Sequence, residues 1–400
     1  MSGRRLLVFA IALTGVALSS EWGLLTRLAY LLWGLTIAAW LWSWLSVRGV
    51  QVDRRPETDR LTAGETLRER LTIVNRWPWP RLWLAVQAGS DLPGYQSDWV
   101  GWLGPWGRRS WTSHTVCRRR GLYRLGPVWL TGADPGGFFP RRRRVETTAT
   151  VLVYPPVLPL DRPPLPPTWL PQADRLVTLW PAVSPLVAGV REYRPGDSLR
   201  YVHWPATARH QRFIVKEFEP ETAADLWLVL DGEATAQAGQ DEASTEEYAV
   251  RAAAALAGWA LARRRAVGLL ATGEPGQCLE PTAEPGQDDA VLTALALFRS
   301  TGQRPLARVL AQEQGRFRRA SVVLVITASA VPDWPAVLAD LRAAGRLAGA
   351  IYLDPASFGA AVDPGPVLTA LQRASLPHCL VRRGDDLATA LTDWSPGGRG

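Results

Sequence analysis

The chain of 400 residues contains a single lysine, Lys216, and this scarcity limits the phosphate sites it can build. No glycine precedes a lysine, so the sequence lacks the phosphate-binding loop of Walker-type nucleotidases. It also lacks Gly-x-Gly-x-x-Gly and Gly-x-Ser-x-Gly, which are typical of dinucleotide-binding domains and of serine hydrolases. The sequence therefore offers none of these nucleotide-binding or catalytic motifs.

Cysteine and histidine are also scarce. The three cysteines, Cys117, Cys278 and Cys379, are odd in number and far apart, which does not fit a disulfide framework or a paired-cysteine metal site and favours a reducing compartment. His114 lies close to Cys117, but a Cys-His pair on one predicted strand is more often incidental than catalytic. We expect a protein that is not an enzyme, with a thiol-dependent hydrolase or transglutaminase-associated enzyme as one rival.

The length and charge indicate a multidomain protein that favours anionic partners. A chain of 400 residues is long enough for two or three domains, and its formal net charge is +8. Because the N-terminus is apolar, the nearest anionic partner is a membrane surface, and we expect no nucleic acid. The run at residues 141–144, four arginines without an aromatic stacking platform, predicts a solvated loop attracted to acidic lipid or to a partner.

Two apolar runs stand at the N-terminus. Residues 6–18 follow Arg4 and Arg5, and residues 28–47 carry no charge, which is about the length that crosses ~30 Å of hydrocarbon. We predict two transmembrane helices within residues 1–48, at about 6–20 and 26–47, in a multi-pass protein of the cell membrane. The first run is short and could instead be the core of a cleaved signal peptide, with a loose cleavage site at residues 17–19.

The charges beside the second run predict its orientation. Trp40, Trp42 and Trp44 crowd its far end, where aromatic rings favour the headgroup region, and basic residues at positions 48, 54 and 55 follow. Positive charge accumulates on the cytoplasmic side of membrane helices. We therefore expect the soluble domains to face the cytoplasm, whether or not the first run is cleaved.

Residues 49–156 and 157–188 differ sharply in composition. The first segment has short alternating or β-branched stretches at 67–74, 82–88, 110–117 and 128–131, broken by Pro, Gly and Asp, which predicts an antiparallel, sandwich-like β domain. Prolines at positions 159, 163, 164, 166, 167, 171, 181 and 185 exclude helix and central strand from the second. We interpret it as a stiff connector whose apolar residues lie against another part of the protein.

The segment at residues 189–221 is dense in Arg, Asp, Glu, Tyr, His and Trp, more than an amphipathic core element needs. One interpretation is a network of surface ion pairs with packed aromatic residues. The other is a docking epitope, because Arg, Tyr and Trp dominate binding hot spots. The candidate partner-binding residues are Arg191, Tyr193, Asp197, Trp204, Arg209, Glu217 and Glu219.

Residues 222–395 alternate apolar runs with helical patterns rich in Ala, Leu and Arg. Such strands are typical of a parallel sheet covered on both faces, so we predict a doubly wound α/β domain. The predicted strands are 226–230, 267–271, 321–326, 348–353 and 378–381, and the predicted helices are 246–264, 288–299, 334–344 and 367–374. Ligands on such sheets bind beyond the carboxyl ends of strands, which directs attention to Asp231.

The spacing in the 189–221 segment resembles the signature of domain of unknown function family 58. The stretches at residues 120–127 and 134–139 match a segment that precedes the signature in that family. Proteins of the family are typically encoded beside an AAA+ ATPase of the MoxR type. The resemblance therefore implies a membrane-anchored, non-catalytic adaptor or scaffold that works with such an ATPase in the assembly or maturation of a client.

The order of a strand, Asp231, a long helix and a short strand also resembles the von Willebrand factor A domain. In that family the first strand ends in Asp-x-Ser-x-Ser and binds a divalent cation, and the matching positions here are Asp231, Glu233 and Thr235. Such oxygen ligands suit Mg²⁺. Thr272 could supply a further ligand, but residues 327–329 lack the second acid, so the site could equally be a degenerate fold element. The alternative function is thus metal-dependent binding of a ligand or protein at Asp231.

Overall fold

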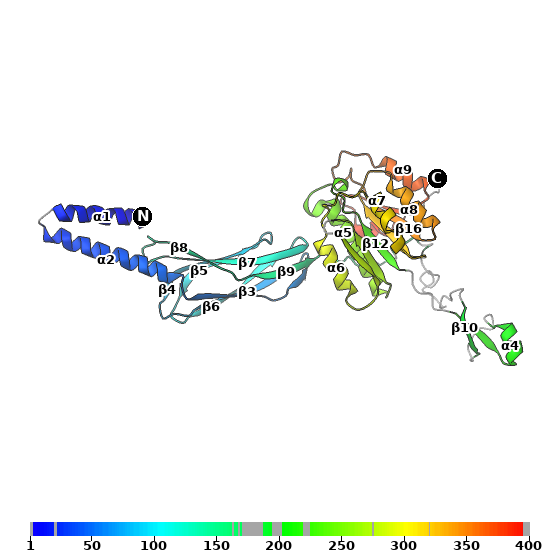
Figure 1. Cartoon of the computed structure of the whole chain (residues 1–400), viewed down its shortest axis with the longest axis horizontal. Coiled ribbons are helices and arrows are strands. Elements are labelled where there is room, and N and C mark those ends of the chain that lie inside the picture. The colour runs from blue at the N-terminus through cyan, green and yellow to red at the C-terminus, as the bar shows by residue number, and fades with distance from the viewer. Residues whose placement is uncertain are drawn as a thin grey trace. The chain divides into compact units, whose positions relative to one another are not determined.

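The computed structural model describes residues 3–19, 22–161, 164–166, 169, 187–193, 202–218, 225–273, 276–319 and 321–394. The chain divides into two compact units, Met1–Pro156 and Val157–Gly400, and each is described by itself (Figure 1).

The first unit begins with a helical hairpin. Helices α1 (Gly3–Ser19) and α2 (Gly23–Ser46) run antiparallel (Figure 1), and the indole of Trp33 donates a hydrogen bond of 3.0 Å to the hydroxyl of Thr14. Of the helices that the structure describes, α2 alone is long and apolar enough to cross a membrane. The predicted hairpin of two helices is present, but the 17 residues of α1, with Arg4 and Arg5 in its first turn, do not meet that criterion.

Two facing sheets follow the hairpin. One has the strand order β1 (Val50–Pro56), β3 (Thr66–Asn75), β6 (Arg108–Val116). The other has the order β2 (Arg60–Thr62), β9 (Ala149–Tyr154), β7 (Gly121–Gly132), β4 (Arg81–Ser90), β5 (Asp98–Leu103), with β8 (Arg141–Val145) also paired to β7. Among these strands the pairing is antiparallel except between β2 and β9, which are parallel.

Alternating side chains from both sheets fill the space between them. Ile73 of β3, Val86 of β4 and Val128 of β7 are fully buried in one cluster, as expected where each strand turns one face inward. Arg54 of β1 and Glu69 of β3 are also buried, and their ion pair measures 2.6 Å. The antiparallel β domain predicted from the sequence is confirmed.

A buried arginine joins the hairpin to the β domain. The guanidinium of Arg81, at the start of β4, donates to the carbonyl oxygens of Leu45 and Arg48, the latter at 2.5 Å. Arg81 thus adds side-chain donors to the carbonyl of Leu45, which also accepts from the backbone N–H of Arg48, and to the carbonyl of Arg48, two residues past the end of α2. Burial lowers the pKa of Arg81 from its ordinary value.

The second unit contains a mixed sheet with the strand order β14-β13-β12-β15-β16-β17 in the described residues. These strands are β12 (Leu226–Leu230), β13 (Val267–Ala271), β14 (Gln277–Thr282), β15 (Val322–Thr327), β16 (Leu347–Leu353) and β17 (His378–Val381). All are parallel to their neighbours except β14, which pairs antiparallel with β13. The sheet thus contains the parallel strands predicted from the sequence, together with an antiparallel edge strand, β14, that was not predicted.

Helices cover both faces of the sheet. Leu228 points into a core shared with α5 (Thr245–Ala262) and α6 (Gln287–Leu297), whereas Trp227 and Val229 point into a second core. That second core contains α7 (Leu306–Glu313), α8 (Trp334–Ala343) and α9 (Gly365–Arg373). The short helix α10 (Leu387–Ala390) joins the first core. Alternation along β12 thus divides its side chains between the two layers.

Most of the predicted connector at 157–188 lies outside the described residues. In its described part, the buried Leu165 belongs to the core beside α5, and Leu158, Leu160 and Trp169 pack against it. Near the end of the described chain, the Trp394 ring lies 6.1 Å from that of Trp169. These four apolar residues of the connector therefore lie against the α/β domain, whereas Val157 is 43% exposed.

Candidate functional site

Strand register brings three polar residues to one edge of the α/β sheet. Leu230 of β12 lies level with Ala271 of β13 on one side and with Ile326 of β15 on the other. The next residues along each strand, Asp231, Thr272 and Thr327, therefore share the carboxyl edge, where open α/β sheets bind ligands.

The carboxylate of Asp231 is buried, and each of its oxygens accepts a hydrogen bond. Its Oδ2 accepts a 2.6 Å hydrogen bond from the hydroxyl of Thr327, and its Oδ1 accepts one of 3.0 Å from the backbone N–H of Glu233. Burial raises the pKa of Asp231 to about 6, although both hydrogen bonds act in the opposite direction. The carboxyl group is thus held in a site that penalises its charged form.

The other two candidate ligands bond to each other. The hydroxyl of Thr235 donates a 2.6 Å hydrogen bond to Glu233 Oε1, at an exposed position. Thr272 is buried, accepts from the N–H of Gly232 at 2.7 Å, and donates to the carbonyl of Leu230 at 3.3 Å. A cation at Asp231 would share these oxygens with the hydrogen bonds that they already make.

Close backbone packing keeps this edge tight. A Cβ added to Gly232 would lie 2.3 Å from the backbone nitrogen of Gly273, so position 232 has no room for a side chain. In the described residues, no three or more His, Cys, Asp or Glu side chains are grouped to hold a metal ion. Magnesium binding by Asp231, Glu233 and Thr235 stays a prediction, as does the degenerate alternative.

The sequence-based reasoning missed a second strand-end acid. Asp354 follows β16, is buried, accepts from the backbone N–H of Ala356 at 3.1 Å, and lies 3.5 Å from Nε of Arg382. The signal was available, because Asp354 comes directly after an apolar strand, as Asp231 does.

The signature segment forms a small module of its own. Strands β10 (Val187–Glu192) and β11 (Ile214–Phe218) pair antiparallel, and α4 (Trp204–His210) lies between them in the chain. His203 caps α4 by accepting from the N–H of Ala206 at 3.1 Å. The hydroxyl of Thr207 accepts from the N–H of Ile214 at 3.1 Å, which ties the helix to β11.

Aromatic and basic side chains are exposed on this module. Trp204 is 63% exposed and Phe213 is 51% exposed, whereas Val202, Ile214 and Val215 are buried. The Tyr193 and Phe213 rings lie 6.0 Å apart. Arg209 is exposed, and the exposed Arg212 forms a 2.8 Å ion pair with Glu192. A small buried core thus carries exposed aromatic and cationic side chains.

The remaining predicted partner-binding residues are only partly placed. Arg191 lies in β10 opposite Val215, and Glu217 lies in β11 opposite Gly189. Asp197 and Glu219 lie outside the described residues. Of the seven predicted residues, the structure therefore gives side-chain surroundings for Tyr193, Trp204 and Arg209.

The cysteines occupy separate environments. Cys117 and Cys379 are buried, Cys278 is exposed, and all three are free thiols. Burial raises the pKa of each thiol above its ordinary value. A raised pKa lowers the fraction of nucleophilic thiolate at neutral pH.

Residues 189–355 match the family described as "Protein of unknown function DUF58". The chain is also similar to "Uncharacterized protein YeaD" of Bacillus subtilis (strain 168), with 26% identity over 195 residues, which cover 46% of this chain and 48% of that protein. The chain thus spans about half the length of the curated relative that it matches.

Structural likeness to solved proteins is slight. The CARDB domain of PF1109 from Pyrococcus furiosus matches over 26% of this chain and 94% of its own, with 15% identity and a TM-score of 0.21. The human complex of zinc 2-glycoprotein and prolactin inducible protein matches over 27% of this chain and 97% of that chain, with 9% identity and a TM-score of 0.22. TM-scores this low do not establish a shared fold.

Proposed function

We propose that this chain, which carries a DUF58 domain at residues 189–355, is a non-catalytic adaptor anchored in the cell membrane by its N-terminal helices. Its partner is an AAA+ ATPase of the MoxR type, which the resemblance to the family implies, and the α/β domain is of the von Willebrand factor A type. The pair would act in the assembly or maturation of a client.

Helix α2 supplies the membrane anchor. Its 24 residues would extend about 36 Å, more than the ~30 Å of hydrocarbon that a span has to cross. Helix α1 would accompany it as the second arm of a multi-pass hairpin. Arg48 and the basic strand β8 mark the cytoplasmic side, whereas Arg54, also expected there, is buried with Glu69.

The observation that carries the proposal is the exposed face of the signature module. Trp204 and Phe213 are large apolar side chains held outward by a module with its own buried residues. Exposing such rings to water is unfavourable, and a partner that covers them gains the burial free energy. Arg209, which is also exposed on α4, belongs with Trp to the residue types that concentrate binding energy at protein interfaces.

The test is affinity purification of the tagged full-length protein from native membranes, in ATP and in ADP. Trp204→Ala and Arg209→Ala should each weaken capture of the ATPase, by roughly 30-fold for a hot-spot residue worth about 2 kcal/mol. The matched control is Arg373→Ala, an exposed arginine in the last turn of α9, which should capture the ATPase like the wild type. Capture that survives both module substitutions would remove the module from the interface.

A metal-dependent binding protein is the second candidate, because Asp231, Thr272 and Thr327 place oxygen atoms at one sheet edge. Measurable Mg²⁺ affinity that Asp231→Ala abolishes would support it. A Mg²⁺ titration of the wild-type protein that detects no binding would remove it.

A further inference from the structure

The end of the β domain next to α2 is rich in tryptophan and arginine. The Trp79 ring lies 6.1 Å from that of Trp42 in α2, and the backbone N–H of Trp106 donates to the carbonyl of Trp77 at 3.2 Å. Trp79 is 49% exposed and Trp106 is 66% exposed. Tryptophans of the β domain therefore extend the aromatic belt of the helix, and such rings favour the headgroup region of a membrane.

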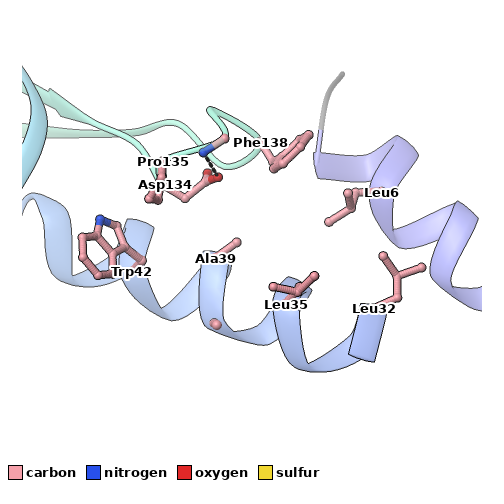
Figure 2. A pocket seen from close by; sticks show the side chains of 10 residues that line it. Leu6, Leu32, Leu35, Ala39, Trp42, Asp134, Pro135 and Phe138 are labelled. Carbon is pink, nitrogen blue, oxygen red and sulfur yellow. Dashed lines mark hydrogen bonds between the residues drawn. The ribbon is translucent and has the colours of Figure 1, made fainter. Parts of the chain in front are cut away.

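The loop between β7 and β8 reaches along the helical hairpin. The carbonyl of Phe138 accepts from the N–H of Gly3 at 2.8 Å, and the carbonyl of Phe139 accepts from the hydroxyl of Ser43. Figure 2 shows Phe138 and Pro135 facing Leu35 and Trp42 of α2 across an apolar cavity of about 450 Å³. The tip of this loop thus lies beside the apolar part of α2.

Asp134 keeps the polar backbone of this loop satisfied. Its two carboxylate oxygens accept from the N–H groups of Gly136, at 3.1 Å, and Phe139, at 2.7 Å. Backbone polar groups at membrane depth need partners within the protein, and Asp134 supplies two of them here although residues 135–137 are exposed. The sequence that follows changes from Phe138-Phe139 to the arginines of β8 within two residues.

Those arginines lie at the end of α2. Nη1 of Arg143 donates a 3.2 Å hydrogen bond to the carbonyl of Val47, and the guanidinium of Arg141 lies 5.4 Å from the centre of the Trp40 ring. Arg48 lies 3.7 Å from the centre of the Trp44 ring. In the described residues, no carboxylate forms an ion pair with Arg48, Arg141 or Arg143.

Several of these arginines and tryptophans line a pocket of about 520 Å³. Its lining has no acidic residue and consists of Trp44, Val47, Arg48, Gly49, Trp77, Arg141, Arg142 and Arg143. A volume of this size is typical of small-molecule sites. Several guanidinium groups without carboxylate partners, in a pocket that two indoles also line, match a phosphate at the level where a membrane helix leaves the hydrocarbon.

We propose that this pocket binds the phosphate headgroup of an anionic phospholipid, whose acyl chains lie along α2. The assignment rests on α2 crossing the membrane, as in the proposed function, but it does not depend on any protein partner. An anionic lipid bound in this way would hold the β domain against the membrane surface.

The experiment titrates the full-length protein, in a non-ionic detergent, with dihexanoyl-phosphatidylglycerol, and counts bound lipid by native mass spectrometry. Each Arg near a membrane surface contributes about a fivefold change in affinity. Arg141→Gln/Arg143→Gln should therefore bind roughly 30-fold more weakly, and Arg48→Gln about fivefold more weakly. The control Arg68→Gln/Arg70→Gln, which removes the same charge from exposed positions of β3, should bind like the wild type.

Three results would overturn the proposal. An equal loss of lipid affinity in the control variant would show that the overall charge of the protein, and not this pocket, determines binding. Equal binding of dihexanoyl-phosphatidylcholine would show that anionic character is not recognised. Competition by inorganic phosphate at the same concentration as the lipid would show that the ligand of the pocket is free phosphate. The adaptor proposal can fail separately, because no ATPase takes part in this measurement.

Discussion

Replacing Asp231 with asparagine should stabilise the α/β domain at neutral pH. The folded protein raises the pKa of this carboxyl from 3.8 to about 6, chiefly through burial. Because a pKa difference of one corresponds to about 1.4 kcal/mol, ionising Asp231 in the folded state costs about 3 kcal/mol. Asparagine has nearly the same shape and no charge to desolvate, and its amide oxygen can still accept from the N–H of Glu233.

The sign of the pH dependence follows from linkage. Below the unfolded pKa, near 4, the carboxyl is protonated in both states and the folded protein has its full stability. Between pH 4 and 6 the unfolded chain ionises first, so the free energy of unfolding falls as pH rises, and it levels off above about pH 6. Asp231→Asn should remove this fall and gain up to about 3 kcal/mol at pH 7.5, with little change at pH 4.

Cys379 gives a readout confined to the α/β domain. It is fully buried in the core beside α5, so a thiol reagent reaches it only when that domain opens. In full-length protein carrying Cys117→Ser and Cys278→Ser, urea titrations equilibrated at each pH and pulse-labelled at one common pH would give the unfolding midpoint. A wild-type midpoint that does not fall between pH 4 and 6, or a variant that falls equally, would refute the reasoning.

Asp354→Asn is the matched control. Asp354 is also a buried carboxyl at a strand end, but it forms an ion pair with the more exposed Arg382. Neutralising it should cost up to about 1 kcal/mol at pH 7.5, the opposite sign to Asp231→Asn.

Three further substitutions test the packing. Arg81→Ala removes the donors to the carbonyls of Leu45 and Arg48, so we expect the free energy of unfolding of the first unit to fall by about 2–4 kcal/mol. Thermal unfolding followed by circular dichroism would show this as a lower melting temperature, and an unchanged melting temperature would contradict it. Glu69→Gln leaves Arg54 buried without its counter-charge, at a cost of roughly 3–5 kcal/mol, whereas exposed Glu57→Gln should be neutral. Thr327→Val removes the hydrogen bond to Asp231 Oδ2, which lowers the pKa of this carboxyl, so the pKa should rise further in the variant. The fall in the free energy of unfolding should then extend above pH 6 in the Cys379 assay. An unshifted profile would show that this bond does not stabilise the carboxylate.

Periodicity in the sequence was sufficient for the elements that are apolar on both faces. Strands β12 and β13 occupy the predicted residues 226–230 and 267–271, because a strand covered by helices on both sides reads as a continuous apolar run. Strand β14 was missed because none of its six residues is buried, two of them are exposed, and it contains Pro281. Its edge position makes an apolar run unnecessary.

The buried polar residues could not be predicted from the sequence. Arginine is rarely buried, so nothing marked Arg54 or Arg81 as interior groups. Their roles depend on Glu69 and on the carbonyls at the end of α2, which tertiary packing brings to them. Likewise, the runs at residues 76–80 and 141–144 are far apart in sequence, and only the fold places Trp77 and Arg141 in one pocket.

Site-specific crosslinking in living cells tests the central claim most directly. A photoreactive amino acid at position 204 of the full-length protein should crosslink to an AAA+ ATPase, whereas the same amino acid at position 373, on exposed α9, should not. If the ATPase crosslinks to position 373 and not to position 204, docking through the signature module is contradicted. If position 204 crosslinks only to other proteins, the adaptor function is contradicted.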